Sequence, residues 1–228
     1  MYGLETPESD TDIRGVFLNT DPADIIGLGR SDVLKAEGDD TVLFELRHFL
    51  KSLSKTNTQA VELLFAEEYL EIEPEFEKIR ENRLRLIDSK RLFSSLKGYI
   101  GNERRLANGE RTGNLGSKRK QQIEKYGFSP KNFSHLFRLA YCGSAFFRTS
   151  FYPVKISRMD SGMHEFIFSV KTEPWKYTKE YLNTMADKAL LRLESDFNAR
   201  QEEFFFDIDF ANQICLESYL PFLQGGTQ

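Results

Sequence analysis

Hydrophobic positions divide the chain into a first part with short strand-like runs and a longer second part with helical spacing. Residues 13–19 and residues 41–45 form mainly apolar runs, each short enough for a buried strand. The second run passes directly into residues 46–55, where apolar side chains recur on one helical face until Asn57 ends the pattern. That face consists of Leu46, Phe49, Leu50 and Leu53. The first part therefore predicts a small sheet whose second strand leads into a helix.

From about residue 74 the apolar spacing is helical. The predicted helices cover residues 74–87, 89–106, 131–147 and 177–200. Between them, residues 107–122 are polar, contain three glycines and predict a loop. Residues 151–170 hold two short apolar runs around a turn and predict a small β-hairpin. The sequence thus indicates an α+β protein, with a small mixed-sheet core over residues 1–73 and a mainly helical region over residues 74–228.

Composition narrows the class of protein. The chain has 228 residues, of which 40% are hydrophobic and 29% charged, as in ordinary globular proteins. A formal net charge of −4 argues against a protein that coats nucleic acid along its whole surface, although a local basic patch stays open. We find neither a run of about 18 apolar residues nor a secretory leader, so we expect a cytoplasmic protein without a membrane partner. The two cysteines and three histidines fit no metal-ligand spacing.

Candidate chemistry lies directly before the first predicted strand. Ser9, Asp10, Thr11 and Asp12 lead into the apolar run, and residues two apart on an extended chain point to the same face. Asp10 and Asp12 would therefore present two carboxylates side by side, which repel unless a cation neutralises them. Hard oxygen ligands suit Mg²⁺ or Mn²⁺, as in two-metal phosphoryl transfer sites. The alternative is that Ser9 and Asp10 only cap the turn before the strand.

A third acid, Glu45, ends the second predicted strand and opens the helix that follows. If the two strands lie side by side, Glu45 can complete a triad with Asp10 and Asp12. Alternatively, Glu45 is an acid of the first helical turn that interacts favourably with the helix dipole.

The chain resembles predicted nucleotidyltransferases of the DNA polymerase beta superfamily, in a branch met in bacteria and phages. The resemblance rests on an ordered set of motifs that covers nearly the whole chain. They are YGLETPESDTDIRG over residues 2–15, FELRHFL over 44–50, TN at 56–57, VELL over 61–64, KGY over 97–99, KNFSHLFR over 131–138 and SYLP over 218–221.

The resemblance implies a nucleotidyltransferase core over residues 1–73 in which Asp10, Asp12 and Glu45 are catalytic and hold two divalent ions, Mg²⁺ or Mn²⁺. The substrate would be an NTP, whose nucleoside monophosphate is transferred to a hydroxyl of a nucleic-acid end, a protein or a small molecule. Contacts with the nucleotide or the acceptor are expected at Gly3, Ser9, Arg14, Tyr99, Lys131, His135 and Arg138. The oligomeric state is left open.

Several of these positions have a structural alternative. His135 fits a core histidine, with the neighbouring cations extending along the surface, and Tyr99 fits a core aromatic. Glu62 fits either an acid behind the metal site or an ordinary helix residue.

The superfamily places a Gly-Ser dipeptide before the Tyr-Gly of this signature, where Met1 stands here. We therefore expect either that the chain starts late or that it lacks this phosphate-binding loop. The second case leaves a different function open, that of a non-catalytic nucleotide- or RNA-binding module. A helical partner-binding subunit, such as an antitoxin-like regulator, is a further alternative.

Overall fold

The computed structural model describes residues 2–4, 13–26, 33–35, 41–110, 117–156 and 160–224. The chain forms two compact units. The sheet unit comprises Thr6–Leu92 and Glu203–Gln228, and the helical unit comprises Met1–Glu5 and Phe93–Glu202. The α+β class predicted from the sequence is confirmed. The predicted division at residue 73 differs from these compact units and stays a prediction about the extent of the nucleotidyltransferase core.

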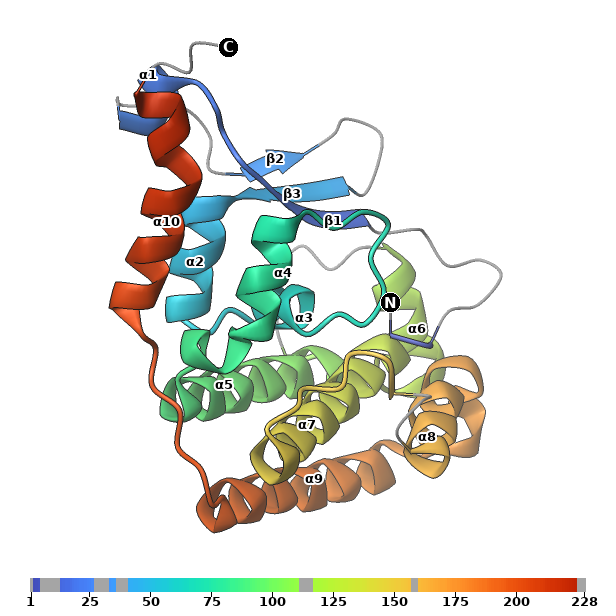
Figure 1. Cartoon of the computed structure of the whole chain (residues 1–228). Coiled ribbons are helices and arrows are strands. Elements are labelled where there is room, and N and C mark those ends of the chain that lie inside the picture. The colour runs from blue at the N-terminus through green and yellow to red at the C-terminus, as the bar shows by residue number, and fades with distance from the viewer. Residues whose placement is uncertain are drawn as a thin grey trace. The chain divides into compact units, whose positions relative to one another are not determined.

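The sheet unit contains a three-stranded sheet in the order β1-β3-β2 (Figure 1). Its strands are β1 (Ile13–Phe17), β2 (Val33–Lys35) and β3 (Thr41–Glu45). β1 runs parallel to β3, with Ile13 opposite Thr41 and Phe17 opposite Glu45, whereas β2 is antiparallel to β3. The predicted strand pair is therefore confirmed, and the chain between its members forms α1 (Pro22–Ile26) and β2.

Helices bury their apolar faces against one another beside the sheet. They are α2 (Leu46–Ser54), α3 (Thr58–Leu64), α4 (Pro74–Glu81), η1 (Arg83–Leu86) and α10 (Ile208–Leu223). In α2, Phe49 and Leu53 are fully buried, as their helical spacing predicts. Asn57 separates α2 from α3 and caps α3 by accepting hydrogen bonds from the backbone N–H groups of Gln59 and Ala60. The C-terminal helix α10 lies beside α2 within this unit (Figure 1).

The helical unit is organised around one long apolar helix, α7, which packs against α8 and α9. Its elements are most of α5 (Ser89–Ala107), α6 (Ser117–Tyr126), α7 (Pro130–Thr149), α8 (Ser161–Thr172), η3 (Pro174–Lys176) and α9 (Lys179–Ala199). Gly143 lets α7 approach its neighbours closely. A Cβ at this position would lie 2.6 Å from Leu96 Cδ1 of α5 and 2.9 Å from Leu193 Cδ1 of α9.

Two local predictions are wrong. The β-hairpin predicted near residues 151–170 is absent, because residues 161–172 form α8, which Asp160 caps by accepting a hydrogen bond from Met163 N at 2.9 Å. Within the loop predicted over residues 107–122, residues 117–122 instead belong to α6. A run such as residues 166–170 suits either a strand or one face of a helix, and here packing against α7 decides for the helix.

The predicted helix over residues 74–87 is interrupted at Asn82, which separates α4 from η1. No pattern of apolar residues predicted α10, which contributes buried side chains to the sheet unit. They are Phe210, Ala211, Ile214 and Tyr219. Among the helices that the structure describes, none is long and apolar enough to cross a membrane.

Candidate functional site

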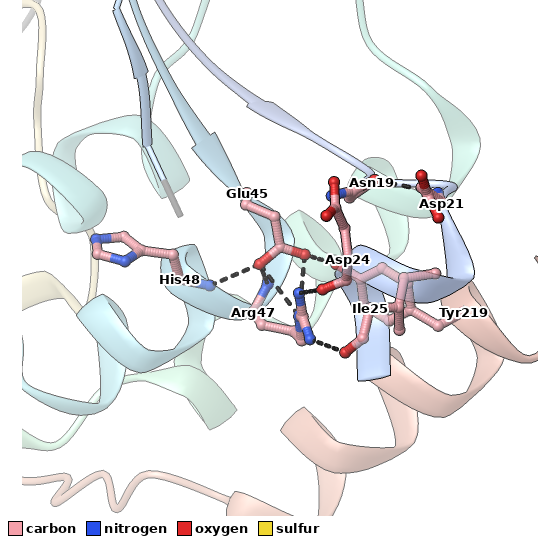
Figure 2. Close-up of polar contacts among 8 residues, drawn as sticks. All are labelled: Asn19, Asp21, Asp24, Ile25, Glu45, Arg47, His48 and Tyr219. Atoms are coloured by element: carbon pink, nitrogen blue, oxygen red, sulfur yellow. Dashed lines mark hydrogen bonds and ion pairs between the residues drawn. The ribbon is translucent and has the colours of Figure 1, made fainter. Parts of the chain in front are cut away.

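Glu45 lies at the junction of β3 and α2 and is buried, with 2% of its surface exposed. Its extended backbone ends the strand, and its carboxylate accepts hydrogen bonds from Arg47 N at 3.0 Å and from His48 N at 3.3 Å (Figure 2). These N–H groups belong to the first turn of α2 and have no partner within the helix. The side chain of Glu45 therefore caps α2, and the negative charge lies at the positive end of the helix dipole.

Two further side chains complete the surroundings of this carboxylate. The Tyr219 hydroxyl of α10 donates a hydrogen bond to Glu45 Oε1, and Arg47 Nε lies 3.2 Å from the same oxygen. Burial, and then the hydrogen bond to Glu45, raises the pKa of Tyr219 well above its ordinary value. Burial lowers the pKa of Arg47, but the charges of Glu45 and Tyr219 and the hydrogen bonds to them together more than offset this effect, and the net shift is upward. The tyrosine therefore stays a neutral donor and the arginine a cation.

Arg47 also joins this junction to α1. Its guanidinium donates to the carbonyl oxygen of Ile25 and, at 3.3 Å, to that of Asp24 (Figure 2). These two carbonyls belong to the last turn of α1, where carbonyl groups have no partner within the helix. Residues Glu45, Arg47 and Tyr219, which we call the Glu45 cluster, thus connect β3, α1, α2 and α10 through polar contacts.

The register of the sheet separates Glu45 from the start of β1. Ile13, which directly follows Asp12 in the sequence, is opposite Thr41, whereas Glu45 is opposite Phe17. At about 3.3 Å per residue, the four residue steps from Ile13 to Phe17 span roughly 13 Å. Asp10, Asp12 and Ser9 lie outside the described residues, so the predicted triad stays a prediction.

Arg14 of β1 faces Glu62 of α3. Arg14 Nη1 lies 3.9 Å from Glu62 Oε2, and the Glu62 side chain is 2% exposed against 19% for Arg14. The ion pair gives the buried Glu62 a specific partner, and its role as an acid behind the metal site stays a prediction. The nucleotide contact predicted for Arg14 stays a prediction.

In the helical unit, His135 of α7 lies beside Glu103 of α5, with 3.4 Å between His135 Nδ1 and Glu103 Oε2. The same oxygen accepts a hydrogen bond from Asn132 Nδ2 at 2.7 Å, and Ser129 Oγ donates to Asn132 Oδ1 at 2.7 Å. Sequence reasoning missed Glu103. Its only signal is a four-residue spacing from Tyr99, which places the two side chains on one face of α5.

Burial raises the pKa of Glu103, but hydrogen bonds from His135 and Asn132 lower it by more, so the net pKa lies below its ordinary value. The ionised carboxylate therefore stabilises the fold above the ordinary pKa of 4.5, and this contribution disappears as the pH falls through the lowered value. We expect the difference in free energy of unfolding between wild type and Glu103→Gln to shrink below about pH 4. Urea titrations at several pH values measure it, with Glu194→Gln, at an exposed carboxylate, as control. A difference that grows as the pH falls would contradict the assigned direction.

The three positions of α7 at which ligand contacts are predicted differ in their surroundings. Lys131 is exposed, and the His135 side chain is 41% exposed. Arg138 is buried, and its guanidinium lies 3.9 Å from the centre of the Tyr2 ring. Tyr99 of α5 is 39% exposed and is therefore no core aromatic. Lys131, His135 and Tyr99 are thus accessible to a ligand, whereas Arg138 is occupied with the N-terminal segment.

Gly3 adopts a φ of +73°, a conformation that glycine tolerates better than other residues, and its carbonyl oxygen contacts His164 Nε2 of α8. Within the described ranges, no three His, Cys, Asp or Glu side chains are grouped as a metal site would require. Residues 2–4 and the first residues of β1 are the two ends of the motif over residues 2–15. The structure describes both ends of this motif.

Comparison with known proteins agrees with these observations. The model of the RlaP family, described as an RNA repair pathway DNA polymerase beta family, matches residues 1–154. No curated protein matches the chain, and no solved structure does. The matched residues include β1, β3, the Glu45 cluster except Tyr219, and α7, whereas α8, α9 and α10 lie outside them. The chain belongs to the RNA repair pathway DNA polymerase beta family.

Proposed function

We propose that this protein is a metal-dependent nucleotidyltransferase that moves a nucleoside monophosphate from an NTP to a hydroxyl at an RNA end. Family membership supports the polymerase beta-like chemistry and the connection with RNA repair. The observation that carries the proposal is the placement of the Asp-x-Asp motif, directly before a strand that pairs in parallel with β3.

The parallel register points to a different third acid from the one that the sequence suggests. β1 and β3 begin at the same end of the sheet, with Ile13 opposite Thr41. Asp12 precedes Ile13 in the sequence, and Asp40 precedes Thr41. Asp40 is therefore a better candidate than Glu45 to join Asp10 and Asp12, because consecutive Cα atoms are only about 3.8 Å apart.

Carboxylate oxygens are the ligands that Mg²⁺ and Mn²⁺ prefer, so the donor set Asp10, Asp12 and Asp40 fits these ions in its chemistry. When bound, the metal would supply charge stabilisation of the phosphates and a lower pKa for the attacking hydroxyl. The three carboxylates would bind the metal ion and hold it in position. The Arg14–Glu62 ion pair on β1 and α3 would hold the strand that follows Asp12 in place.

Transfer of label from an NTP to RNA tests the proposal directly. The protein is incubated with the four α-labelled NTPs, Mg²⁺ or Mn²⁺, and short RNAs that carry either a 3′-hydroxyl or a 3′-phosphate. We expect labelled product only with the hydroxyl end, and a return to background when EDTA removes the metal. NTP binding without transfer to any acceptor would instead favour the non-catalytic nucleotide- or RNA-binding alternative.

A further inference from the structure

The two compact units carry opposite net charges. The helical unit, residues 1–5 and 93–202, has 19 Lys and Arg against 12 Asp and Glu, a formal charge of +7. The sheet unit has 12 against 23, a formal charge of −11. The overall charge of −4 is therefore the sum of a basic part and an acidic part. Because RNA is bound largely through its phosphates, the helical unit is the part of the chain whose charge suits RNA.

Large aromatic side chains are exposed where α8 is joined to α9. Trp175 of η3 is 66% exposed, and Tyr181 of α9 is 47% exposed. Tyr181 stacks on Tyr177, with ring centres 5.9 Å apart and 17° between the ring planes. The Tyr177 hydroxyl forms a hydrogen bond with Ser169 Oγ, and its ring makes an edge contact with Phe166 of α8. An aromatic ring that is held in place and exposed to solvent is the feature on which unpaired RNA bases stack.

Two cations follow Tyr181 on the same side of α9. Lys188 and Arg192 lie seven and eleven residues after Tyr181, a spacing that places all three side chains on one face of a helix. Both cationic side chains are exposed. At 1.5 Å per residue, Tyr181 and Arg192 are about 16 Å apart along the helix axis. We call Tyr181, Lys188 and Arg192 the α9 face.

Most acidic side chains of α9 are paired with cations of neighbouring helices. Asp187 Oδ1 lies 2.6 Å from Arg104 Nη1, and Glu194 Oε1 lies 2.6 Å from Lys97 Nζ, both cations belonging to α5. Glu180 lies in the first turn of α9, where a negative charge interacts favourably with the helix dipole. The carboxylates of Asp187 and Glu194 are thus already compensated and oppose a phosphate group only weakly.

The fourth acid, Asp196, is shared by two guanidinium groups. Its Oδ2 lies 3.4 Å from Arg148 Nε of α7 and 3.9 Å from Arg192 Nε. One carboxylate compensates only one of two positive charges. The α9 face therefore has a net positive charge at the Arg192 end.

We propose that the α9 face binds single-stranded RNA, with Tyr181 and Trp175 stacking on bases and Lys188 and Arg192 pairing with phosphates. A single strand is the occupant, because stacking on an exposed ring requires an unpaired base. The inference rests on the proposed function, to which it adds a binding surface for the RNA acceptor. It extends that function to α9, which lies outside the family-matched residues 1–154.

Trp175 is the only tryptophan of the chain, so its fluorescence reports stacking directly. The full chain is titrated with a short single-stranded RNA, without NTP or metal. We expect the fluorescence to be quenched on binding, and much less so by the same sequence in a duplex. Tyr181→Ala should raise the Kd roughly tenfold, the typical effect of a lost base-stacking contact, whereas Tyr181→Phe keeps the ring and should retain binding.

The salt dependence of binding tests the two cations separately from the ring. Each phosphate contact on a single strand contributes about 0.7 to the slope of log K against log salt concentration. Lys188→Gln combined with Arg192→Gln should therefore weaken binding and reduce the slope by about 1.4. Tyr181→Ala removes no charge and should leave the slope unchanged. Lys78→Gln combined with Lys90→Gln is the matched control, because it removes two cations from ion pairs of the sheet unit.

Three results would overturn the inference. They are the absence of RNA binding, the absence of Trp175 quenching, and an unchanged Kd in both Tyr181→Ala and the Lys188 and Arg192 variant with native unfolding curves. The exposed aromatic side chains would then be left to a protein partner.

The binding assay and the transfer assay separate this inference from the proposed function. If the wild type binds RNA through the α9 face but transfers no label, the proposed function fails and the inference stands. If it transfers label to RNA and the variants of the α9 face bind RNA normally, the proposed function stands and the inference fails.

Discussion

Replacement of Asp10 or Asp12 by Asn reduces nucleotide transfer by roughly 10³-fold or more, while the unfolding curve stays that of the wild type. Asn keeps the shape of the side chain but removes the charge that would hold the divalent ion, and the phosphates then face no compensating cation. Label transfer to the 3′-hydroxyl RNA measures the effect. Asp187→Asn is the matched control, because it removes a carboxylate from a surface ion pair with Arg104 of the helical unit.

The same assay identifies the third acid. Asp40→Asn should reduce transfer as much as Asp10→Asn does, because the parallel register of β1 and β3 favours Asp40 as their partner. Glu45→Gln should retain most of the transfer activity. The reverse result, in which Glu45→Gln is inactive and Asp40→Asn is active, would restore Glu45 as the third metal ligand and refute the argument from the register.

Glu45→Ala destabilises the protein by about 2–4 kcal/mol, the expected cost of removing a helix cap together with a buried charged partner. Without the carboxylate, the Arg47 and His48 N–H groups lose their acceptor, and the Tyr219 hydroxyl loses its partner in a buried position. We place the contribution of the Arg47 ion pair low, because its side chain is 31% exposed and solvent screens the charge. Urea denaturation measures the change.

A double-mutant cycle separates the contact with α10 from the cap. Tyr219→Phe removes only the hydroxyl, and we expect a loss of about 1–2 kcal/mol. In the Glu45→Ala background the same substitution should cost much less, since its acceptor is already gone. Strict additivity of the two changes would contradict a direct interaction between them. Glu45→Gln, which keeps an acceptor oxygen, should lie between wild type and Glu45→Ala in stability.

The spacing of apolar residues along the chain predicted the long helices well and the short elements poorly. α5, α7 and α9 agree with the predictions from the spacing of their apolar residues, because each buries apolar side chains, and Leu96 of α5 and Leu193 of α9 lie close to Gly143 of α7. Residues 166–170 misled the prediction, since a run of aromatic and branched side chains suits both a strand and a buried helix face. α10 escaped detection because its buried residues alternate with exposed apolar ones, such as Leu216 at 59%.

The family was predictable from an ordered set of short motifs, and the family match confirms it. The metal site at Asp10 and Asp12 was read from consecutive residues in the same way, and it stays a prediction. The spacing from Tyr99 was the only local signal for Glu103, because its partners His135 and Asn132 lie on another helix. His164 and Lys171 of α8 form hydrogen bonds to the backbone carbonyl groups of Gly3 and Leu4, more than 150 positions away. No pattern of neighbouring residues predicted these contacts.

The sequence by itself determined the α+β class, the strand-to-helix junction at Glu45 and the family, because these depend on short-range periodicity and on residue types in a fixed order. Only the tertiary structure decided that β1 and β3 are parallel and in which register. In this register Glu45 lies opposite Phe17, at the other end of the strand pair from Ile13. There it caps α2 and accepts a hydrogen bond from Tyr219. The physical reason is that strand pairing and helix packing depend on which apolar surfaces bury one another away from water. Those surfaces are formed by residues that are distant in the chain.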